Sequence, residues 1–359
     1  MAIWNIRKKK GDLSEQESLA SSAKAQPESL AAFETPAPYN VKDTSITASG
    51  LYPHEVLLID SAVGFFIDQE EFPPLWQREY GILQMTKLLA SLVERGFLTD
   101  APMQSTLESA TVTTLKHALK EAGRPVGGKK AELIQRLLHT VPEGQLYELF
   151  PRRTFAPTQS GIRALDESMH ISYLHRHPVE ELTIWVLHRL VVENPEKSYR
   201  DLVWSHLESR AHAHIKAEDY AAYRACRYRM YQFHMEENKR KRAFPFLAEV
   251  IYYDLSGAGG GADTLQRYIS EKYFFPYDRS IVKLPGVCVS AMGKLRDELG
   301  LTEEMLKALL MQFFGQLSVP FHLFTVEECA VIVLLELRGD AEKLRKVYQL
   351  AEKRFTQRK

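Results

Sequence analysis

The chain has 359 residues, a length typical of two or three domains. Its 46 Lys and Arg balance 46 Asp and Glu, which excludes a globally basic, histone-like binder and requires any nucleic-acid surface to be local. The 45% apolar content excludes wholesale disorder, and three widely spaced cysteines exclude a disulfide scaffold and a thiolate zinc site.

Targeting signals are not evident in the sequence. No apolar run approaches the roughly 20 residues that a membrane span needs. The basic first segment is not followed by the apolar region of a signal peptide. We therefore expect a cytoplasmic protein that does not bind membranes.

The first third of the chain is predicted to begin with a flexible arm and to continue as helices. Residues 1–48 are rich in Ser, Ala, Glu and Pro without an apolar period, which predicts the arm. Apolar residues recur at helical spacing from Met85 to Val93, and Gly96 is expected to end that helix. Phe97-Leu98 is predicted to form a short strand or an extended link.

Residues 111–138 contain two short helical patterns separated by a link. Leu115, Ala118 and Leu119 share one helical face, and Gly123 is expected to end the first helix. The Pro and Gly residues of 125–128 predict an extended turn. A second helix is predicted to start at Lys129, with Leu133, Ile134, Leu137 and Leu138 facing inward.

This segment concentrates positive charge in a chain whose net charge is zero. Between residues 107 and 141 there are six basic side chains against three acidic ones. Lys129 and Lys130 are placed in the first turn of the second helix, where the macrodipole disfavours cations by about 0.3–1 kcal/mol. An anion bound at that terminus would remove the conflict. The predicted nucleic-acid-binding residues are Lys116, Lys120, Arg124, Lys129, Lys130 and Arg136.

The segment resembles the SAP motif, a helix-extended-helix module of DNA- and RNA-associated proteins. The most specific matching run is Gly128-Lys-Lys-Ala-Glu-Leu-Ile134. Arg124 stands where the family usually has leucine, and Thr114 replaces the usual acidic residue near the start of the first helix. The resemblance implies contacts to nucleic-acid backbone and groove, commonly in A·T-rich duplex, although some members bind mainly protein.

The whole chain looks like uncharacterised SAP-containing proteins of Gram-positive bacteria or their mobile elements. That resemblance rests on residues 76–98 and on Tyr252-Tyr-Asp-Leu-Ser-Gly257. It implies no activity for the C-terminal half.

From Gly161 onward the chain is predicted to be almost entirely helical, and a linker precedes that region. Residues 142–160 form a linker with a short helix at 145–150 and an extended stretch at 155–159. Thr325 and Glu328 form a capping-box pattern. The helices predicted from apolar spacing are 180–193, 218–242, 245–255, 292–299, 303–314, 329–337 and 341–355.

Other motifs in the sequence have ordinary explanations. Gly123 to Lys129 fits the nucleotide-binding pattern GxxxxGK, but Lys130 stands where Ser or Thr would hold Mg²⁺ and a helix is predicted before it. His175, His177, His206, His212 and His214 lack a metal-binding spacing, so no metal site is predicted. The three cysteines are expected to be buried and inert.

An aromatic and basic stripe along residues 220–231 leaves three interpretations open. It consists of Tyr220, Tyr223, Arg227 and Tyr231, and Lys239-Arg-Lys-Arg242 follows it. Such a stripe can pack against another helix, which we favour, or stack nucleic-acid bases, or bind a protein partner.

Together these patterns predict a mostly α protein. The predicted segments are a flexible arm (1–48), an N-terminal helical module (49–106), the SAP-like module (107–141), a linker (142–160) and a C-terminal helical domain (161–359). We expect a non-catalytic nucleic-acid-binding protein without cofactor, with duplex DNA favoured and RNA possible, and a possible protein partner for the C-terminal domain. The alternatives are a helical scaffold whose SAP-like module docks protein, and an enzyme with its active site in 161–359.

Overall fold

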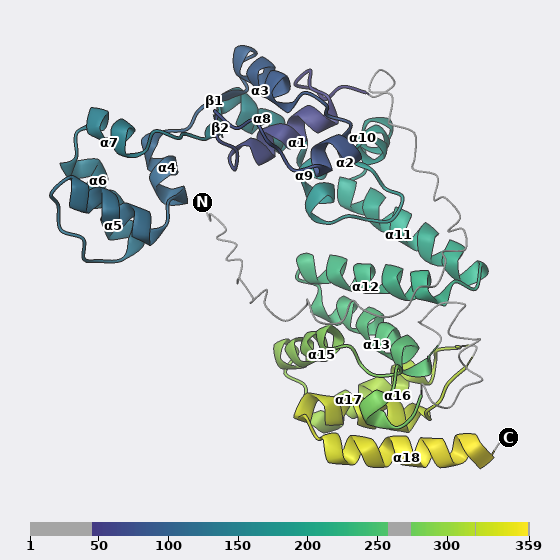
Figure 1. Cartoon of the computed structure of the whole chain (residues 1–359). Helices are drawn as coiled ribbons and strands as arrows, with labels where there is room; N and C mark the ends of the chain where they lie inside the picture. Colours follow the sequence, from purple (N-terminus) through teal and green to yellow (C-terminus); the bar gives the residue numbers. More distant parts are fainter. Residues whose placement is uncertain (1–44, 258–273, 320, 358–359) are drawn as a thin grey trace, which may run out of the picture. The chain divides into compact units, whose positions relative to one another are not determined.

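The computed structural model describes residues 45–257, 274–319 and 321–357 (Figure 1). The predicted arm lies outside these residues except for its last four positions. The fold is mostly α, as predicted. No helix in the described part of the chain is long and apolar enough to cross a membrane.

The helices of the first half are α1 (Pro53–Ala62), α2 (Leu75–Tyr80), α3 (Met85–Glu94), α4 (Met103–Ser109), α5 (Val112–Glu121), α6 (Lys130–Thr140), α7 (Glu143–Leu149), α8 (Gln159–Glu167) and α9 (Met169–Arg176). Those of the second half are α10 (Ile184–Glu193), α11 (Tyr199–Lys216), α12 (Tyr220–Glu236), α13 (Arg240–Ser256), the 3-10 helix η4 (Tyr277–Arg279), α15 (Gly286–Glu298), α16 (Glu303–Phe314), α17 (Val326–Arg338) and α18 (Ala341–Gln357).

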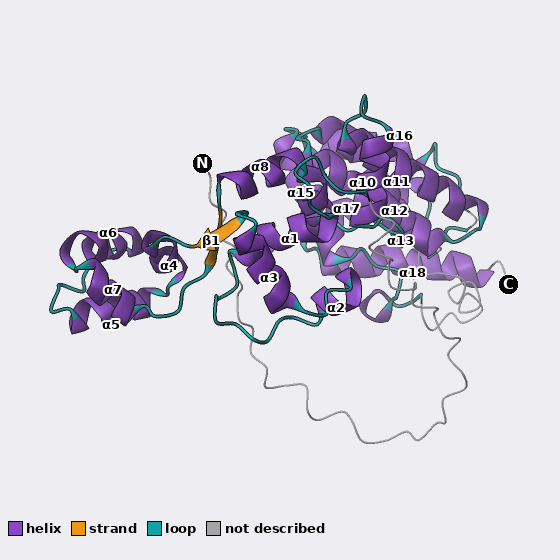
Figure 2. Cartoon of the chain, turned by 90° about the horizontal axis from the view of Figure 1, so that it is seen from above, coloured by secondary structure: helices purple, strands orange, loops and turns teal. Residues whose placement is uncertain are grey.

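Two short strands bracket the segment that contains α4 to α7. Strand β1 (Leu98–Asp100) precedes it, β2 (Phe155–Pro157) follows it, and the two pair antiparallel (Figure 2). The pairing continues one step inward, because the Ala101 amide donates to the Thr154 carbonyl at 2.8 Å. Both strands were expected as extended segments, but only the structure shows that they pair. The helices α4 to α7 are thus an insertion whose two ends are held together.

Three hydrophobic clusters organise the described residues. One draws on residues 51–98 and 155–233, a second on 103–150, and a third on 231–351. Segments 51–98 and 155–233 therefore share one core, although the sequence-based division assigned them to separate units. The insertion has a core of its own.

The helix predicted over residues 218–242 is interrupted in the structure. α12 ends at Glu236, and Asn238 takes a left-handed conformation with φ of 58°. The Lys239 amide donates to the His234 carbonyl at 2.8 Å, which closes the turn after α12. Asn tolerates this conformation better than most residues. α13 then begins at Arg240 and runs through Pro245, which the sequence placed at its start.

The start of α17 confirms the predicted capping box. The Thr325 hydroxyl accepts from the Glu328 amide at 3.2 Å, and the Glu328 carboxylate accepts from the Thr325 amide at 2.9 Å.

Candidate nucleic-acid interface

The two helices predicted within residues 111–138 are α5 and α6, and their apolar faces meet. The buried residues of this cluster are Met103, Leu107, Leu115, Ala118, Leu119, Leu133, Ile134, Leu137, Val141, Leu146 and Phe150. The core thus also takes residues from α4 and α7, which extends the module on both sides of the predicted helix pair.

Both ends of α5 are closed by local hydrogen bonds. The Thr111 hydroxyl accepts from the Thr114 amide at 3.1 Å. Gly123 has a φ of +65°, and the Arg124 amide donates to the Leu119 carbonyl at 2.7 Å. This is the glycine-based helix end predicted from the sequence.

Arg136 holds the link between the helices in place. Its Nη1 donates to the Pro125 carbonyl at 2.6 Å and to the Gly127 carbonyl at 2.8 Å. Residues 124–127 form neither helix nor strand. A helix precedes this link, as predicted, rather than the strand that a nucleotide-binding P-loop requires.

The N-terminus of α6 differs from the prediction. The helix begins at Lys130, and Lys129 is its N-cap residue. The Glu132 carboxylate accepts from the Lys129 amide at 3.2 Å. An acid of the protein itself therefore occupies part of this terminus, where we expected a bound anion to relieve the lysine pair.

Glycine is required beside that carboxylate. Gly128 has a φ of +124°, and a Cβ at this position would lie 2.5 Å from Glu132 Oε2. Gly127 by contrast has open space around it. A side chain at position 128 would therefore strain the backbone and displace the Glu132 carboxylate.

Three of the six predicted binding residues donate to backbone carbonyls within the module. Arg124 reaches the Thr140 carbonyl at 2.8 Å, and Lys130 Nζ reaches the Glu108 carbonyl at 2.6 Å. Both carbonyls lie in the last turn of a helix, where the macrodipole favours a cation. With Arg136, these side chains help to fix the shape of the module. Arg124 thus makes a polar contact where SAP motifs usually have leucine.

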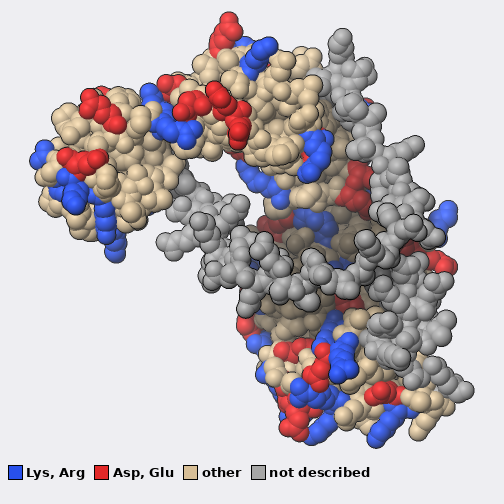
Figure 3. Space-filling model, viewed as in Figure 1, with Lys and Arg blue, Asp and Glu red and all other residues tan. Residues whose placement is uncertain are grey.

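The other three predicted binding residues are exposed and have no polar partner among the described residues. Lys116 and Lys120 lie one turn apart on α5, and Lys129 lies at the start of α6. Their side chains make no ion pair or hydrogen bond with the described residues. In Figure 3, Lys and Arg side chains stand out from the surface of α4 to α7, with acidic side chains among them. These three lysines can take an external anion without breaking a contact.

The histidines named in the sequence contact different partners. None of the described residues forms a group of three or more His, Cys, Asp or Glu side chains that could hold a metal ion. Tyr80 Oη lies 2.6 Å from His175 Nδ1, and His214 Nε2 lies 2.6 Å from Glu180. His206 and His212 contact the backbone carbonyls of Glu180 and Glu208, and His177 lies 3.1 Å from Glu236.

The three cysteines are free and buried, as predicted. Burial raises the pKa of Cys226 to about 11 and that of Cys288 to about 12, and it raises the pKa of Cys329 as well. Thiols with such pKa values are poor nucleophiles near neutral pH.

The aromatic and basic stripe of α12 contacts α13. Tyr223 and Arg227 both donate to the Glu249 carboxylate at 2.6 Å. Arg224 donates to both oxygens of Asp254, at 2.8 Å and 2.7 Å. These pairs confirm the helix–helix interpretation of the stripe.

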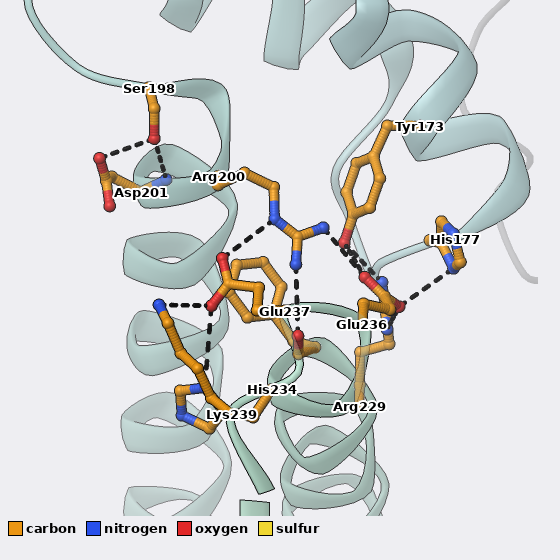
Figure 4. Close-up of polar contacts among 11 residues, drawn as sticks. Tyr173, His177, Ser198, Arg200, Asp201, Arg229, His234, Glu236, Glu237 and Lys239 are labelled. Atoms are coloured by element: carbon orange, nitrogen blue, oxygen red, sulfur yellow. Dashed lines mark hydrogen bonds and ion pairs between the residues drawn. The ribbon is translucent and has the colours of Figure 1, made fainter. Parts of the chain in front are cut away.

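An ion-pair network that the sequence did not reveal joins α9, α11 and α12 (Figure 4). Arg200 donates to Glu236 at 2.9 Å and to Glu237 at 3.3 Å, and Arg229 donates to Glu236 at 2.7 Å. Tyr173 also donates to Glu236, at 2.9 Å. Up to 63 positions separate these partners along the chain, so no local motif could have signalled the network.

Comparison with known proteins identifies one domain. Residues 106–141 match the SAP domain, which covers α5, α6 and most of α4. No curated protein and no solved structure matches the chain.

Proposed function

We propose that this chain is a non-catalytic protein that binds duplex DNA through phosphate contacts of its SAP domain. A SAP domain is generally a DNA-binding module, and its presence supports a nucleic-acid-binding role. The observation that carries the proposal is the set of three exposed, unengaged lysines on that domain, Lys116, Lys120 and Lys129. Arg124, Lys130 and Arg136 add positive charge while they hold the module's backbone.

Sequence selectivity is expected to be modest. Phosphate contacts position a protein on a duplex but carry no base information.

The cytoplasmic location and the bacterial origin that we propose are each supported by one feature. The free, buried cysteines support a reducing cytoplasm. The resemblance of residues 76–98 and 252–257 supports an origin in Gram-positive bacteria or their mobile elements.

The test removes the three lysines together, as Lys116→Gln, Lys120→Gln and Lys129→Gln. Each phosphate contact contributes roughly −0.9 to the slope of log K against log salt, so the variant should flatten the slope by up to about 2.7. The loss should be similar for unrelated duplex sequences. Fluorescence anisotropy with labelled duplexes at several salt concentrations measures both quantities.

A charge-matched control is available outside the SAP domain. Lys87, Lys197 and Lys353 are exposed, and their side chains make no ion pair or hydrogen bond with the described residues. Their replacement by Gln should leave the slope unchanged. Unchanged binding in the folded SAP-domain variant would reject the proposal and favour the protein-docking scaffold. Tighter binding of single-stranded DNA or RNA than of duplex would reject the duplex part alone.

A further inference from the structure

A pocket of about 580 Å³ lies among α11, α12 and α13, outside the SAP domain. Its volume falls within the roughly 300–1,000 Å³ typical of small-molecule sites. The residues that line it are Asp201, Trp204, Phe233, His234, Glu237, Lys239, Lys241, Arg242, Pro245 and Phe246. It thus combines four aromatic rings with three members of the basic run 239–242, whose role the sequence left open, and with two carboxylates, those of Asp201 and Glu237.

The aromatic wall is built around Trp204. Its ring centroid lies 4.6 Å from that of His234, 5.4 Å from Phe233 and 5.6 Å from Phe246. Trp204 itself is only partly buried. The indole is therefore held by its neighbours while part of it remains available to a flat ligand in the pocket.

Two basic side chains at the edge of the pocket have no polar partner among the described residues. Lys239 pairs with Glu237 at 2.7 Å. Lys241 and Arg242 are exposed, and neither side chain makes an ion pair or hydrogen bond with the described residues. An anionic group can therefore bind these two residues without displacing a carboxylate of the protein.

His234 supplies a buried polar atom without a hydrogen bond. The residue is 7% exposed, and its Nδ1 has no hydrogen-bond partner among the described residues. The nearest carboxylate oxygen, on Glu237, lies 4.0 Å away. This nitrogen is buried behind the pocket surface, so the imidazole contributes its ring to the aromatic wall rather than a hydrogen bond to a ligand. Burial lowers the pKa of His234, which keeps the ring neutral.

We propose that this pocket binds a nucleotide, with the base against Trp204 and Phe246 and the phosphate on Lys241 and Arg242. A nucleotide joins a flat aromatic ring to an anion, and the pocket offers a surface for each. A simple anion would leave the aromatic wall unused, and an apolar ligand would leave the cations unused. The nucleotide can be free or part of a single strand, since both present the same groups.

Binding is tested with adenosine monophosphate, adenosine, inorganic phosphate and a short single-stranded oligoadenylate as probes, by calorimetry on the full chain. The monophosphate should bind at least about tenfold more tightly than adenosine or phosphate alone, equivalent to about 1.4 kcal/mol. Lys241→Gln with Arg242→Gln should reduce the affinity for the monophosphate about tenfold and leave that for adenosine unchanged. Lys87→Gln with Lys353→Gln, which removes the same charge elsewhere, should change neither.

The outcomes separate the possible sources and the alternatives. Tighter binding of the oligoadenylate than of the monophosphate would identify a strand as the source, and equal binding would identify the free nucleotide. Equal affinity for phosphate and monophosphate, or stronger competition by a phosphorylated peptide, would overturn the proposal. The triple SAP-domain lysine variant should bind the monophosphate normally, so failure of the DNA proposal and failure of this one are distinguishable.

Discussion

Arg136 shows how an arginine expected to contact DNA is used to hold the backbone. One of its nitrogens donates to two carbonyls of the link that precedes α6. Lys116, Lys120 and Lys129 have no such contact, although all four residues were predicted as one binding group. At the residue scale, a basic side chain that donates hydrogen bonds to backbone carbonyls of the protein has a structural role. A basic side chain without such a contact is available to a ligand.

Arg136→Ala should loosen the SAP domain. Loss of a charge-assisted pair of hydrogen bonds is expected to cost about 1–2 kcal/mol, or roughly five- to thirty-fold faster amide exchange in α5 and α6. Hydrogen exchange on the full chain measures this locally. Lys129→Ala is the matched control and should leave exchange unchanged. Unchanged exchange together with weaker DNA binding in Arg136→Ala would instead assign Arg136 to the DNA contact.

Gly128→Ala and Gly127→Ala should differ in effect although they are neighbours. At Gly128 the φ of +124° and the 2.5 Å approach to Glu132 both oppose a Cβ, and a cost of about 1–3 kcal/mol is expected. Gly127 has open space, so alanine there should be neutral. The two variants are compared by hydrogen exchange over α6. Equal protection in both would contradict both the backbone strain and the contribution of the Glu132 contact.

At the scale of elements, the contact between α12 and α13 depends on charged residues that are largely buried. Glu249 is 6% exposed and accepts hydrogen bonds from Tyr223 and Arg227. A buried charge is tolerated only where partners replace its water shell. The stripe of α12 thus has its polar ends paired with α13, which is why it is not free to stack nucleic-acid bases.

Glu249→Ala should destabilise the protein by about 3 kcal/mol, because Arg227 would lose its carboxylate. Chemical denaturation measures the change. Arg227→Met with Glu249→Leu should lose less, since no charge is left unpaired. The control is Glu298→Ala, whose carboxylate pairs with Arg240 and is 29% exposed, where about 1 kcal/mol or less is expected. Equal losses in Glu249→Ala and Glu298→Ala would contradict the larger contribution expected of the buried pair.

At the scale of the whole described chain, α12 contributes to two hydrophobic clusters. Met230 and Phe233 belong to the cluster that includes α1, and Tyr231 belongs to the cluster that includes α18. A helix shared in this way couples the stability of segments that lie far apart in the sequence. Buried groups in either cluster should therefore influence global unfolding.

A contact between α9 and α10 that should be sensitive to acid joins two buried histidines. His170 Nε2 lies 3.0 Å from His188 Nδ1, and the side chains are on residues only 4% and 3% exposed. Burial lowers the pKa of His170 to about 4 and also lowers that of His188. Two protonated rings would place hydrogens between these nitrogens and break the contact.

The free energy of unfolding should fall as the pH is lowered from about 6.5 to about 4. Between these pH values His170 binds a proton in the unfolded chain but not in the folded chain. Its full contribution to the free energy of unfolding is therefore present only above about pH 6.5, and this contribution is lost as the pH falls towards 4. The loss from this residue is on the order of 3 kcal/mol. Denaturation midpoints on both sides of the window measure it. The decline should be shallower in His170→Leu with His188→Leu, but unchanged in the control His139→Gln with His212→Gln. An equally steep decline in the leucine variant would contradict this origin.

The SAP module could be predicted from the sequence because its determinants are local. The apolar period of Leu115, Leu119, Leu133 and Leu137, the threonine cap and the glycine end all lie within about 30 residues and specify two helices with facing apolar sides. The same reasoning located most other helices. The helices α1, α2, α4, α8, α9 and α11 were not among those predicted. In the second half of α11, Ala211 and His214 stand on the buried face, where large apolar residues would have marked it.

Only the tertiary structure decided which charged side chains have partners within the protein and which are available to a ligand. The Lys130 contact to the Glu108 carbonyl crosses 22 positions, and that of Arg224 to Asp254 crosses 30. The pairing of β1 with β2 and the pocket around Trp204 likewise join residues from separate elements. Secondary structure follows from periodicity and caps read along the chain, whereas ion pairs and pockets depend on distances that exist only after the helices have packed.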